Sequence, residues 1–445
     1  MQRRASPSRP RVSGGRPGSS RWSARRWSKP SSRCLGALAL IAALPETAAL
    51  RREQLRLQVA LINPLGVVRG FASPETKAAA EQARLLIVEA QTLGEGPDDP
   101  LLPFVALFGN WLTYFVAFDG DKARQLAEQF LWLAEKQDAV ALRVTAHRIM
   151  GISSLFGGEI ATSRMHLDRA IALYDPTTYR APASRFGVNP HVANLGSRSQ
   201  ALWLLGYPQA ALADVDRAIE AARDTGQAAT IMHPLVLCSW PCAWTGNHVA
   251  AEGLAREAIA LAEHSGGSFW KGLGFVLLGC VFTLRGRAAQ AIDAITSGLA
   301  DNRATGTTLF QPLIFGYLAR AHADLGQFDE AWRWIGEAMA RVESTKEKWA
   351  EAEIHRVAGE IALRSPVPDA TRAESYFTTA LGIARQQQAR SWELRTATSY
   401  ARLMRDAGRA REAYDLLAAS YGWFTEGFGT KDLQDAKALL EELAA

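Results

Sequence analysis

The side chains best suited to metal chemistry in this sequence are two cysteines that lie four residues apart. Cys238 and Cys242 would share one face of a helix, with His233 and His248 nearby, and thiolate and imidazole are ligands that zinc prefers. Structural zinc sites, however, use tighter cysteine pairs with matched partners elsewhere in the chain. We therefore interpret both cysteines as small buried hydrophobic residues and predict no metal site.

The motifs that catalysis most often uses are missing from the sequence. It contains no G-x-x-x-x-G-K-[ST] loop to hold phosphates and no H-E-x-x-H helix. The run GISSL at Gly151 fails the G-x-S-x-G pattern at its last position, and the glycines of GLGFVLLG do not have the spacing of a dinucleotide loop. The sequence thus predicts no catalytic residue and no cofactor, and a protein that is not an enzyme.

Binding is the remaining chemistry, and tryptophans are the first candidates for it. Six of the 13 tryptophans fall on or near predicted first helices of helical hairpins, namely Trp111, Trp203, Trp240, Trp270, Trp349 and Trp392. They could form the aromatic walls of a ligand or peptide groove, or pack between long helices. Charged residues beside two of them could form a polar recognition strip or bridge adjacent helices, and these are Glu351, Glu353, His355, Arg356, Glu393 and Arg395.

A second candidate site is the segment from Asp175 to His191, DPTTYRAPASRFGVNPH. It holds three prolines and cannot be helical throughout. A long loop inside a compact repeat array is more often functional than the helices around it. Its polar residues could point into a groove, or could only solvate and cap; the candidates are Arg180, Arg185, Asn189 and His191.

The elements that must position these residues follow a repeat. Gly206, Gly246, Gly286 and Gly326 are each forty residues apart, and each is followed five residues later by an alanine. Around each glycine, apolar residues recur at helical three- and four-residue spacing. Because glycine adopts a positive φ at no steric cost, it suits the reversal between two helices. Each unit is therefore predicted to be a helix hairpin that needs neighbours to cover its apolar stripe.

This pattern resembles the tetratricopeptide repeat. The copy at Gly326 supplies the positions of that family's pattern with Leu318, Ala319, His322, Gly326, Phe328, Ala331, Ile335 and Ala338. The usual unit is about 34 residues, whereas these units are forty residues long, so each hairpin has extra turns. The resemblance implies an all-α fold, a right-handed superhelical solenoid of antiparallel helix hairpins.

We expect two parts in the chain. Residues 1–34 should be a disordered basic tail, and residues 35–445 a tetratricopeptide-like domain with a loop insertion at 175–191 and a capping helix at 430–443. Hairpins are predicted at 101–136, at 139–174, four times within about 192–345, at 348–388 and from Ser391 onward.

Charge is concentrated in the tail. It holds ten Lys or Arg and no acid, so the remainder has 40 basic against 45 acidic residues and gives no support for a nucleic-acid groove. The tail itself could be a secretory signal region, a nucleic-acid or membrane-binding arm, or a non-native start. Four cysteines and the lack of a long apolar run predict a cytoplasmic protein without a membrane span.

The C-terminal third resembles the end of large bacterial signalling proteins, most specifically in YGWFTEGF followed by DLQDAKALLEEL. Those proteins join a class III adenylate/guanylate cyclase or a DNA-binding domain to an AAA-like ATPase and then to a helical array. The resemblance implies a separated regulatory or sensor array that binds a cyclase/ATPase module, a peptide segment or a small effector. Alternatives are the sensor half of an ATPase-type transcription regulator, and a non-functional gene fragment.

Overall fold

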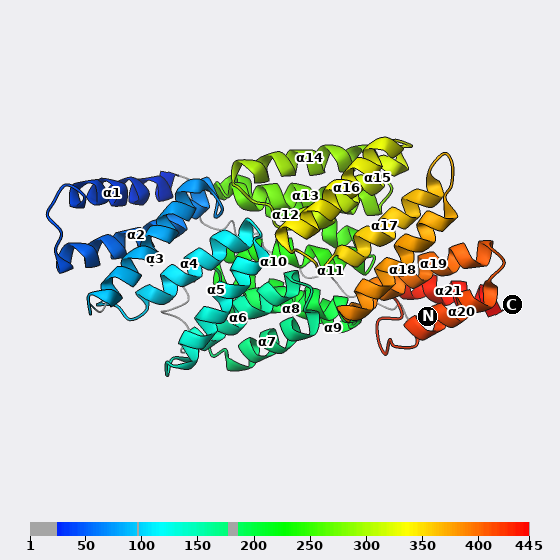
Figure 1. The fold of residues 1–445 in the computed structure, drawn as a ribbon, viewed down its shortest axis with the longest axis horizontal. Helices are drawn as coiled ribbons and strands as arrows, with labels where there is room; N and C mark the ends of the chain where they lie inside the picture. Colours follow the sequence, from blue (N-terminus) through cyan, green and yellow to red (C-terminus); the bar gives the residue numbers. More distant parts are fainter. Residues whose placement is uncertain (1–24, 96–97, 177–185, 445) are drawn as a thin grey trace, which may run out of the picture.

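The chain is an array of antiparallel helix pairs, which confirms the predicted all-α solenoid. The computed structural model describes residues 25–95, 98–176 and 186–444. Figure 1 shows α1 at one end of the long axis and α19 to α21 at the other. The helices of the N-terminal half are α1 (Arg25–Ile41), α2 (Ala48–Arg69), α3 (Pro74–Thr92), α4 (Leu102–Val116), α5 (Gly120–Glu135), α6 (Val140–Phe156), α7 (Ile160–Leu173), α8 (Pro190–Leu204) and α9 (Pro208–Thr225).

The C-terminal half continues the same pattern. Its helices are α10 (Ala228–Leu237), α11 (Ser239–Trp244), α12 (His248–Ser265), α13 (Ser268–Leu284), α14 (Ala288–Ala304), α15 (Gln311–Asp324), α16 (Phe328–Thr345), α17 (Glu351–Arg364), α18 (Ala370–Gln386), α19 (Arg390–Asp406), α20 (Ala410–Tyr421) and α21 (Lys431–Ala444). No helix in the described ranges is both long enough and apolar enough to cross a bilayer.

The hairpin of α15 and α16 shows why the repeat folds this way. Gly326 between the helices has a φ of 74°, a left-handed conformation that costs glycine little. On α16, Ala331, Ile335 and Ala338 are each at most 2 % exposed and recur at the spacing of one helix face. The hairpins predicted from the forty-residue period are therefore confirmed, with the apolar stripe of each turned toward its neighbours.

The N-terminal boundary differs from the prediction. α1 begins at Arg25, so residues 25–34 belong to a helix here, whereas residues 1–24 of the predicted tail lie outside the described ranges. The helix runs through Pro30 into the apolar segment LGALALI, whose Leu38 packs beside Leu61 and Ile62 of α2. The composition of residues 25–34 indicated disorder, but these residues continue into an apolar segment that packs on α2, and such packing stabilises a helix.

The superhelix returns onto itself after five hairpins. The backbone N–H groups of Thr308 and Leu309, before α15, each donate to the carbonyl of Val116 at the end of α4, both at 3.1 Å. One hairpin further along, the N–H of Lys348 donates to the carbonyl of Phe156 at 2.9 Å. Each pair joins hairpins that are five repeats apart. The first turn (α2 to α12) and the second turn (α13 to α21) therefore meet along one seam.

Candidate functional site

The middle of the seam is closed by aromatic rings from both turns. Trp203 of α8 lies 4.7 Å from Trp392 of α19 and 4.6 Å from Trp244 of α11, measured between ring centroids. Trp244 in turn lies 5.8 Å from Trp349, and Trp349 lies 5.5 Å from Phe156 of α6. The four tryptophans are at most 2 % exposed. The inner side of the solenoid is therefore a packed core here, and no open groove passes through it.

A buried carboxyl group lies among these rings. Glu347 is 0 % exposed and accepts hydrogen bonds from the backbone N–H of Phe310 at 3.1 Å and from the indole N–H of Trp349 at 3.0 Å. Phe310 has a φ of 70°, which a bulky residue adopts only when its surroundings hold it there. Burial raises the pKa of Glu347 to about 8, although the two donors oppose that rise. Glu347 thus holds the strained backbone at Phe310, where the second turn of the superhelix meets the first.

Toward the N-terminal end, the seam encloses an aromatic cavity of about 110 Å³. Its walls include Phe108, Trp111, Phe269 and Trp270. Its polar lining includes His233, which is 8 % exposed; burial lowers the pKa of this imidazole to about 3. The cavity therefore presents a mostly apolar surface, with a neutral imidazole at neutral pH and the buried Arg148 also in its lining, and would suit a small, largely apolar ligand.

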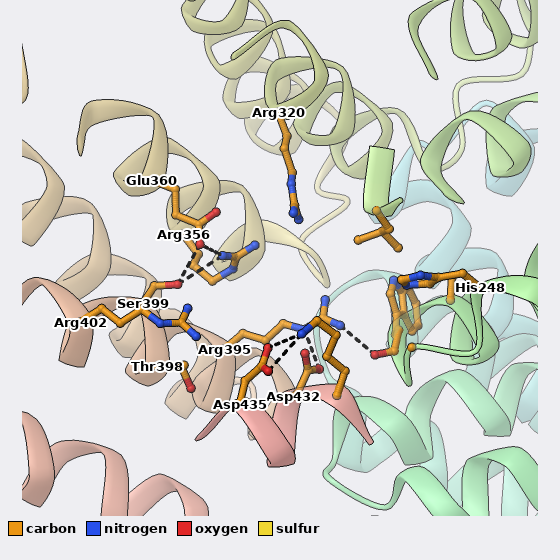
Figure 2. Close-up of a pocket in the computed structure, with 15 residues that line it drawn as sticks. His248, Arg320, Arg356, Glu360, Arg395, Thr398, Ser399, Arg402, Asp432 and Asp435 are labelled. Atoms are coloured by element: carbon orange, nitrogen blue, oxygen red, sulfur yellow. Dashed lines mark hydrogen bonds and ion pairs between the residues drawn. The ribbon is translucent and has the colours of Figure 1, made fainter. Parts of the chain in front are cut away.

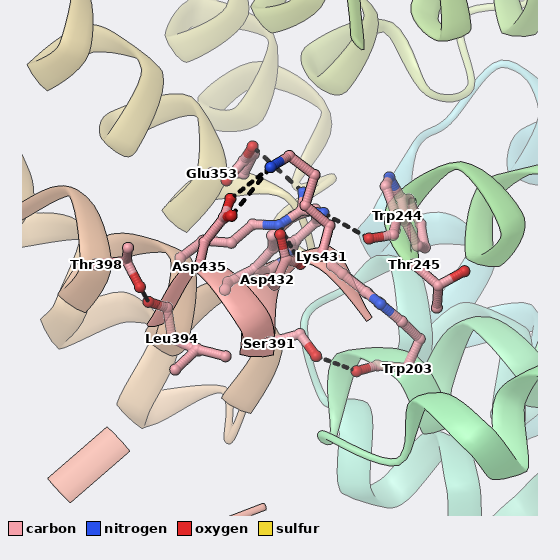
Figure 3. A network of polar contacts seen from close by, with 12 residues as sticks. Trp203, Trp244, Thr245, Glu353, Ser391, Leu394, Thr398, Lys431, Asp432 and Asp435 are labelled. Carbon is pink, nitrogen blue, oxygen red and sulfur yellow. Dashed lines mark hydrogen bonds and ion pairs between the residues drawn. The ribbon is translucent and has the colours of Figure 1, made fainter. Parts of the chain in front are cut away.

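Toward the C-terminal end, the seam is held by charges. Arg395 of α19 donates to the carbonyl of Trp244 at 2.9 Å and to the carboxylate of Asp432 of α21 at 2.8 Å. Figure 3 shows these two partners. Its guanidinium also lies 4.9 Å from the ring centroid of Trp203 and 5.1 Å from that of Trp392, within cation–π range. One arginine thus joins the aromatic core, the end of α11 and the start of α21.

A second buried arginine lies on the first helix of the preceding hairpin. Arg356 of α17 forms a two-point ion pair with Glu353, with both N···O distances at 2.7 Å. It also pairs with Glu360 and donates to the hydroxyl of Ser399 at 3.3 Å. Arg356 and Glu353 are each 6 % exposed. The geometry of this ion pair is favourable, because two N–H groups face two carboxylate oxygens. Removal of either partner would leave a buried charge uncompensated.

These two arginines line a charged cavity of about 170 Å³ that both turns of the superhelix build. The first turn contributes Trp244, Gly246 and His248, and α15 to α21 contribute the charged side chains (Figure 2). Those are Arg320, Arg356, Glu360, Arg395, Arg402, Lys431, Asp432 and Asp435. The volume is several times what one water molecule requires.

The acids of this charged cavity are already paired. Glu360 pairs with Arg356, Asp432 with Arg395, and Asp435 with Lys431. For Arg320 and Arg402, no carboxylate of the described chain lies within ion-pair distance. Figure 2 shows both guanidinium groups turned toward the space between α15, α19 and α21. The site therefore offers two uncompensated cations, a combination that attracts anions.

The predicted aromatic and charged residues divide between these features. Trp349 and Trp392 belong to the closed aromatic core, whereas Trp270 lines the aromatic cavity. Arg356 and Arg395 line the charged cavity, and Glu353 lies against both, with its carboxylate 3.8 Å from Arg395. His355 faces α18 instead, where its ring lies 6.0 Å from that of Tyr376.

The predicted loop residues have local structural roles where they are described. Arg185 lies outside the described residues. The side chain of Asn189 caps α8 by accepting the N–H of His191 at 2.9 Å. The imidazole of His191 stacks on Tyr174 at 4.9 Å, and burial lowers its pKa. The structure does not bring these residues together with the tryptophans and arginines of the seam.

The sequence analysis missed the two residues that make the charged cavity unusual. Arg320 and Arg402 lie on exposed or half-buried helix positions, and nothing in their local sequence separates them from ordinary surface arginines. The signal that could have found them is spatial. Arginines on the first helices of three successive hairpins face one point, and the end of α11, in an earlier hairpin, faces it too.

The cysteine pair has the predicted environment. Cys238 and Cys242 are at most 4 % exposed and pack with Leu195 and Val281. Burial raises the pKa of the Cys242 thiol to about 12, so it stays protonated at neutral pH. Within the described ranges, no group of three or more His, Cys, Asp or Glu side chains could hold a metal ion.

Comparisons with known proteins support the fold. No protein-family model matches this chain, and no curated protein sequence matches it. Among solved structures, a Rap protein complexed with competence and sporulation factor is similar, with a TM-score of 0.57, 11% identity, and coverage of 88% of this chain and 99% of that one. The apo form of RapI is also similar, with a TM-score of 0.45, 9% identity, and coverage of 89% of this chain and 99% of that one.

A more distant likeness is to a STAND signal-transduction ATPase with a tetratricopeptide repeat sensor from Pyrococcus horikoshii. The TM-score is 0.40 at 12% identity, and the match covers 94% of this chain and 66% of that one. Together with the forty-residue repeat, the likeness to the Rap protein establishes a tetratricopeptide-like helical solenoid.

Proposed function

We propose that this chain is a regulatory sensor array that couples ligand binding inside the superhelix to a partner protein. The observation that carries the proposal is the charged cavity, because both turns of the solenoid build it. A ligand held between α11–α12 and α15–α21 contacts both turns at once. Its binding energy therefore acts on how the second turn rests on the first, and a ligand shifts an equilibrium only through such differential contacts.

The partner class comes from the C-terminal sequence. YGWFTEGF and DLQDAKALLEEL resemble the end of bacterial cyclase–ATPase signalling proteins. In this structure the same segments place Trp423 5.3 Å from Tyr207 of the first turn, between ring centroids, and start α21 at the charged cavity. We propose an AAA-like ATPase module as the partner whose activity the array biases, without chemistry of its own.

Titration calorimetry with a recombinant AAA-like ATPase module from the same genome tests this function. We expect a dissociation constant of about 1 μM or lower, together with a change in the rate of ATP hydrolysis when the array is added. An unrelated helical-repeat protein of similar length serves as the control. Absence of binding heat together with an unchanged hydrolysis rate would contradict the proposal.

A further inference from the structure

The charged cavity has a local imbalance that identifies the chemistry of its ligand. Five cationic side chains line it, against three carboxylates. Even when Glu353, which lies behind Arg356, is counted with the acids, the positive charges exceed the negative ones. The excess is localised in Arg320 of α15 and Arg402 of α19, since the other cations have carboxylate partners.

The two uncompensated arginines act on the same point. Burial tends to raise the pKa of Glu360, but the charges of Arg356, Arg320 and Arg402 lower it overall. Both guanidiniums therefore lie close enough to one carboxylate to influence it, yet neither forms an ion pair with it. Like charges that converge on one cavity repel each other, and an anion between them would remove that repulsion.

The rest of the lining suits an anion as well. Ser399 and Thr398 bring hydroxyl groups to the cavity wall, and His248 lies opposite them at the start of α12. Arg356 and Arg395 are held in place by Glu353, Asp432 and the Trp244 carbonyl, so the wall behind the site is rigid. A guanidinium presents paired N–H donors that match a carboxylate or phosphate group in two-point geometry.

From this we infer that the charged cavity is a binding site for a small anion that carries a phosphate or carboxylate group, held between Arg320 and Arg402. The inference deepens the proposed function, on which its regulatory meaning rests, by naming the class of effector. The cavity volume of about 170 Å³ limits the bound part to a compact group. A long peptide does not fit, since aromatic packing closes the neighbouring part of the seam.

Calorimetric titration of the full chain with inorganic phosphate and, separately, with succinate tests the site. Chloride is exchanged at constant ionic strength, so that screening stays the same. We expect saturable binding of at least one of the two anions. The tighter of the two identifies the phosphate or the carboxylate class, and saturable binding of neither would overturn the inference.

Matched variants locate the binding. The double variant R320Q/R402Q should weaken the anion affinity by about tenfold or more, as expected for lost charge-assisted hydrogen bonds. Arg411→Gln is the control, because Arg411 is an exposed arginine of α20 outside the cavity lining. Equal affinity in the double variant and the control would overturn the assignment.

A melting curve without added anion shows whether the double variant is folded. Removal of two uncompensated charges should leave the melting temperature unchanged or raise it, and a folded variant that fails to bind supports the site. A double variant that unfolds in the absence of anion would show that Arg320 and Arg402 are structural, against the inference. Because only the chain and an anion are present, failure here is separate from failure to bind an ATPase module.

Discussion

The aromatic and the charged parts of the seam are built from the same kind of element, yet they differ in what they leave unsatisfied. Around Trp349, rings from both turns fill the space, and the buried carboxyl of Glu347 accepts two hydrogen bonds. Around Arg402, a cavity remains, and two cations have no carboxylate partner among the residues that the structure describes. The aromatic part holds the two turns together, whereas the charged part leaves room for a ligand. The two parts of one seam thus have different roles, since one stabilises the fold and the other can bind.

Removal of an aromatic ring from the closed part should have the largest effect. Trp349 is 1 % exposed, so Trp349→Ala should lower the free energy of unfolding by about 3–5 kcal/mol in denaturant titration. Trp132, which is 57 % exposed, provides the matched control, and its substitution by alanine should cost little. Similar losses for the two variants would mean that the aromatic seam does not hold the turns together.

Substitution of two arginines of the same cavity should lower the stability by very different amounts. Arg356→Gln removes the partner of the buried Glu353 and should cost about 3 kcal/mol of unfolding free energy. Arg402→Gln removes no ion pair and should change stability by no more than about 0.5 kcal/mol. Urea unfolding of both variants measures the difference. A large loss for Arg402→Gln would show that its charge is compensated and would erase the contrast between the two parts of the seam.

Glu347 should give the aromatic part a dependence on pH. Its pKa is about 8 in the folded chain, above the ordinary 4.5, so between these values the folded state holds a proton that the unfolded state has released. Stability should therefore fall as the pH rises from about 5 to about 8, and Glu347→Gln should flatten that slope. Thermal unfolding across this range checks it.

The exposed Glu337 of α16 offers the control for this series, because Glu337→Gln should keep the slope of the parent chain. In contrast, Glu347→Ala leaves the Phe310 and Trp349 donors without an acceptor and should cost about 1–3 kcal/mol. If the Glu347→Gln and parent chains have the same slope, the carboxyl is not protonated in the folded state.

The smallest expected effect is a difference in stability cost between a glycine substituted at the seam and one substituted outside it. Gly206 and Gly286 have φ values of 86° and 69°, so alanine should cost roughly 1–2 kcal/mol at either position. At Gly206 the added Cβ would also lie 2.6 Å from a ring carbon of Trp423, whereas at Gly286 no atom of the described residues lies within 4 Å. Gly206→Ala should therefore cost about 1 kcal/mol more. Equal costs in denaturant titration would argue against close contact of the turns at Gly206.

These glycines also show how far the sequence could predict the molecule. The period of forty residues gave Gly206 and Gly286 the same role, and both do reverse the chain between helices. Their surroundings differ because only Gly206 faces a later turn of the superhelix. Hairpins follow from local spacing, but the pitch that brings hairpins five repeats apart into contact depends on small rotations summed over every repeat.

The same limit applies to the site. Trp349 was a candidate for a groove wall or for packing between helices, and Arg356 and Arg395 were candidates for a polar strip or for bridges between helices; all three lie in the seam. Whether such residues line a groove or close it depends on partners far away in the sequence, as in the hydrogen bonds from Thr308 to Val116 and from Lys348 to Phe156, which each span 192 residues. Arg320 and Arg402 become distinctive only when that pitch places them around one cavity.

Hydrogen–deuterium exchange of the full chain, with and without saturating inorganic phosphate, tests most directly whether the charged part of the seam is its ligand-responsive part. We predict slower exchange on both sides of the charged cavity, at the junction of α11 with α12 and in α19 and α21. Exchange around Trp349 and Phe310 should stay unchanged, because that part is already closed. Unchanged exchange at the cavity, or protection confined to one of the two turns, would contradict the account.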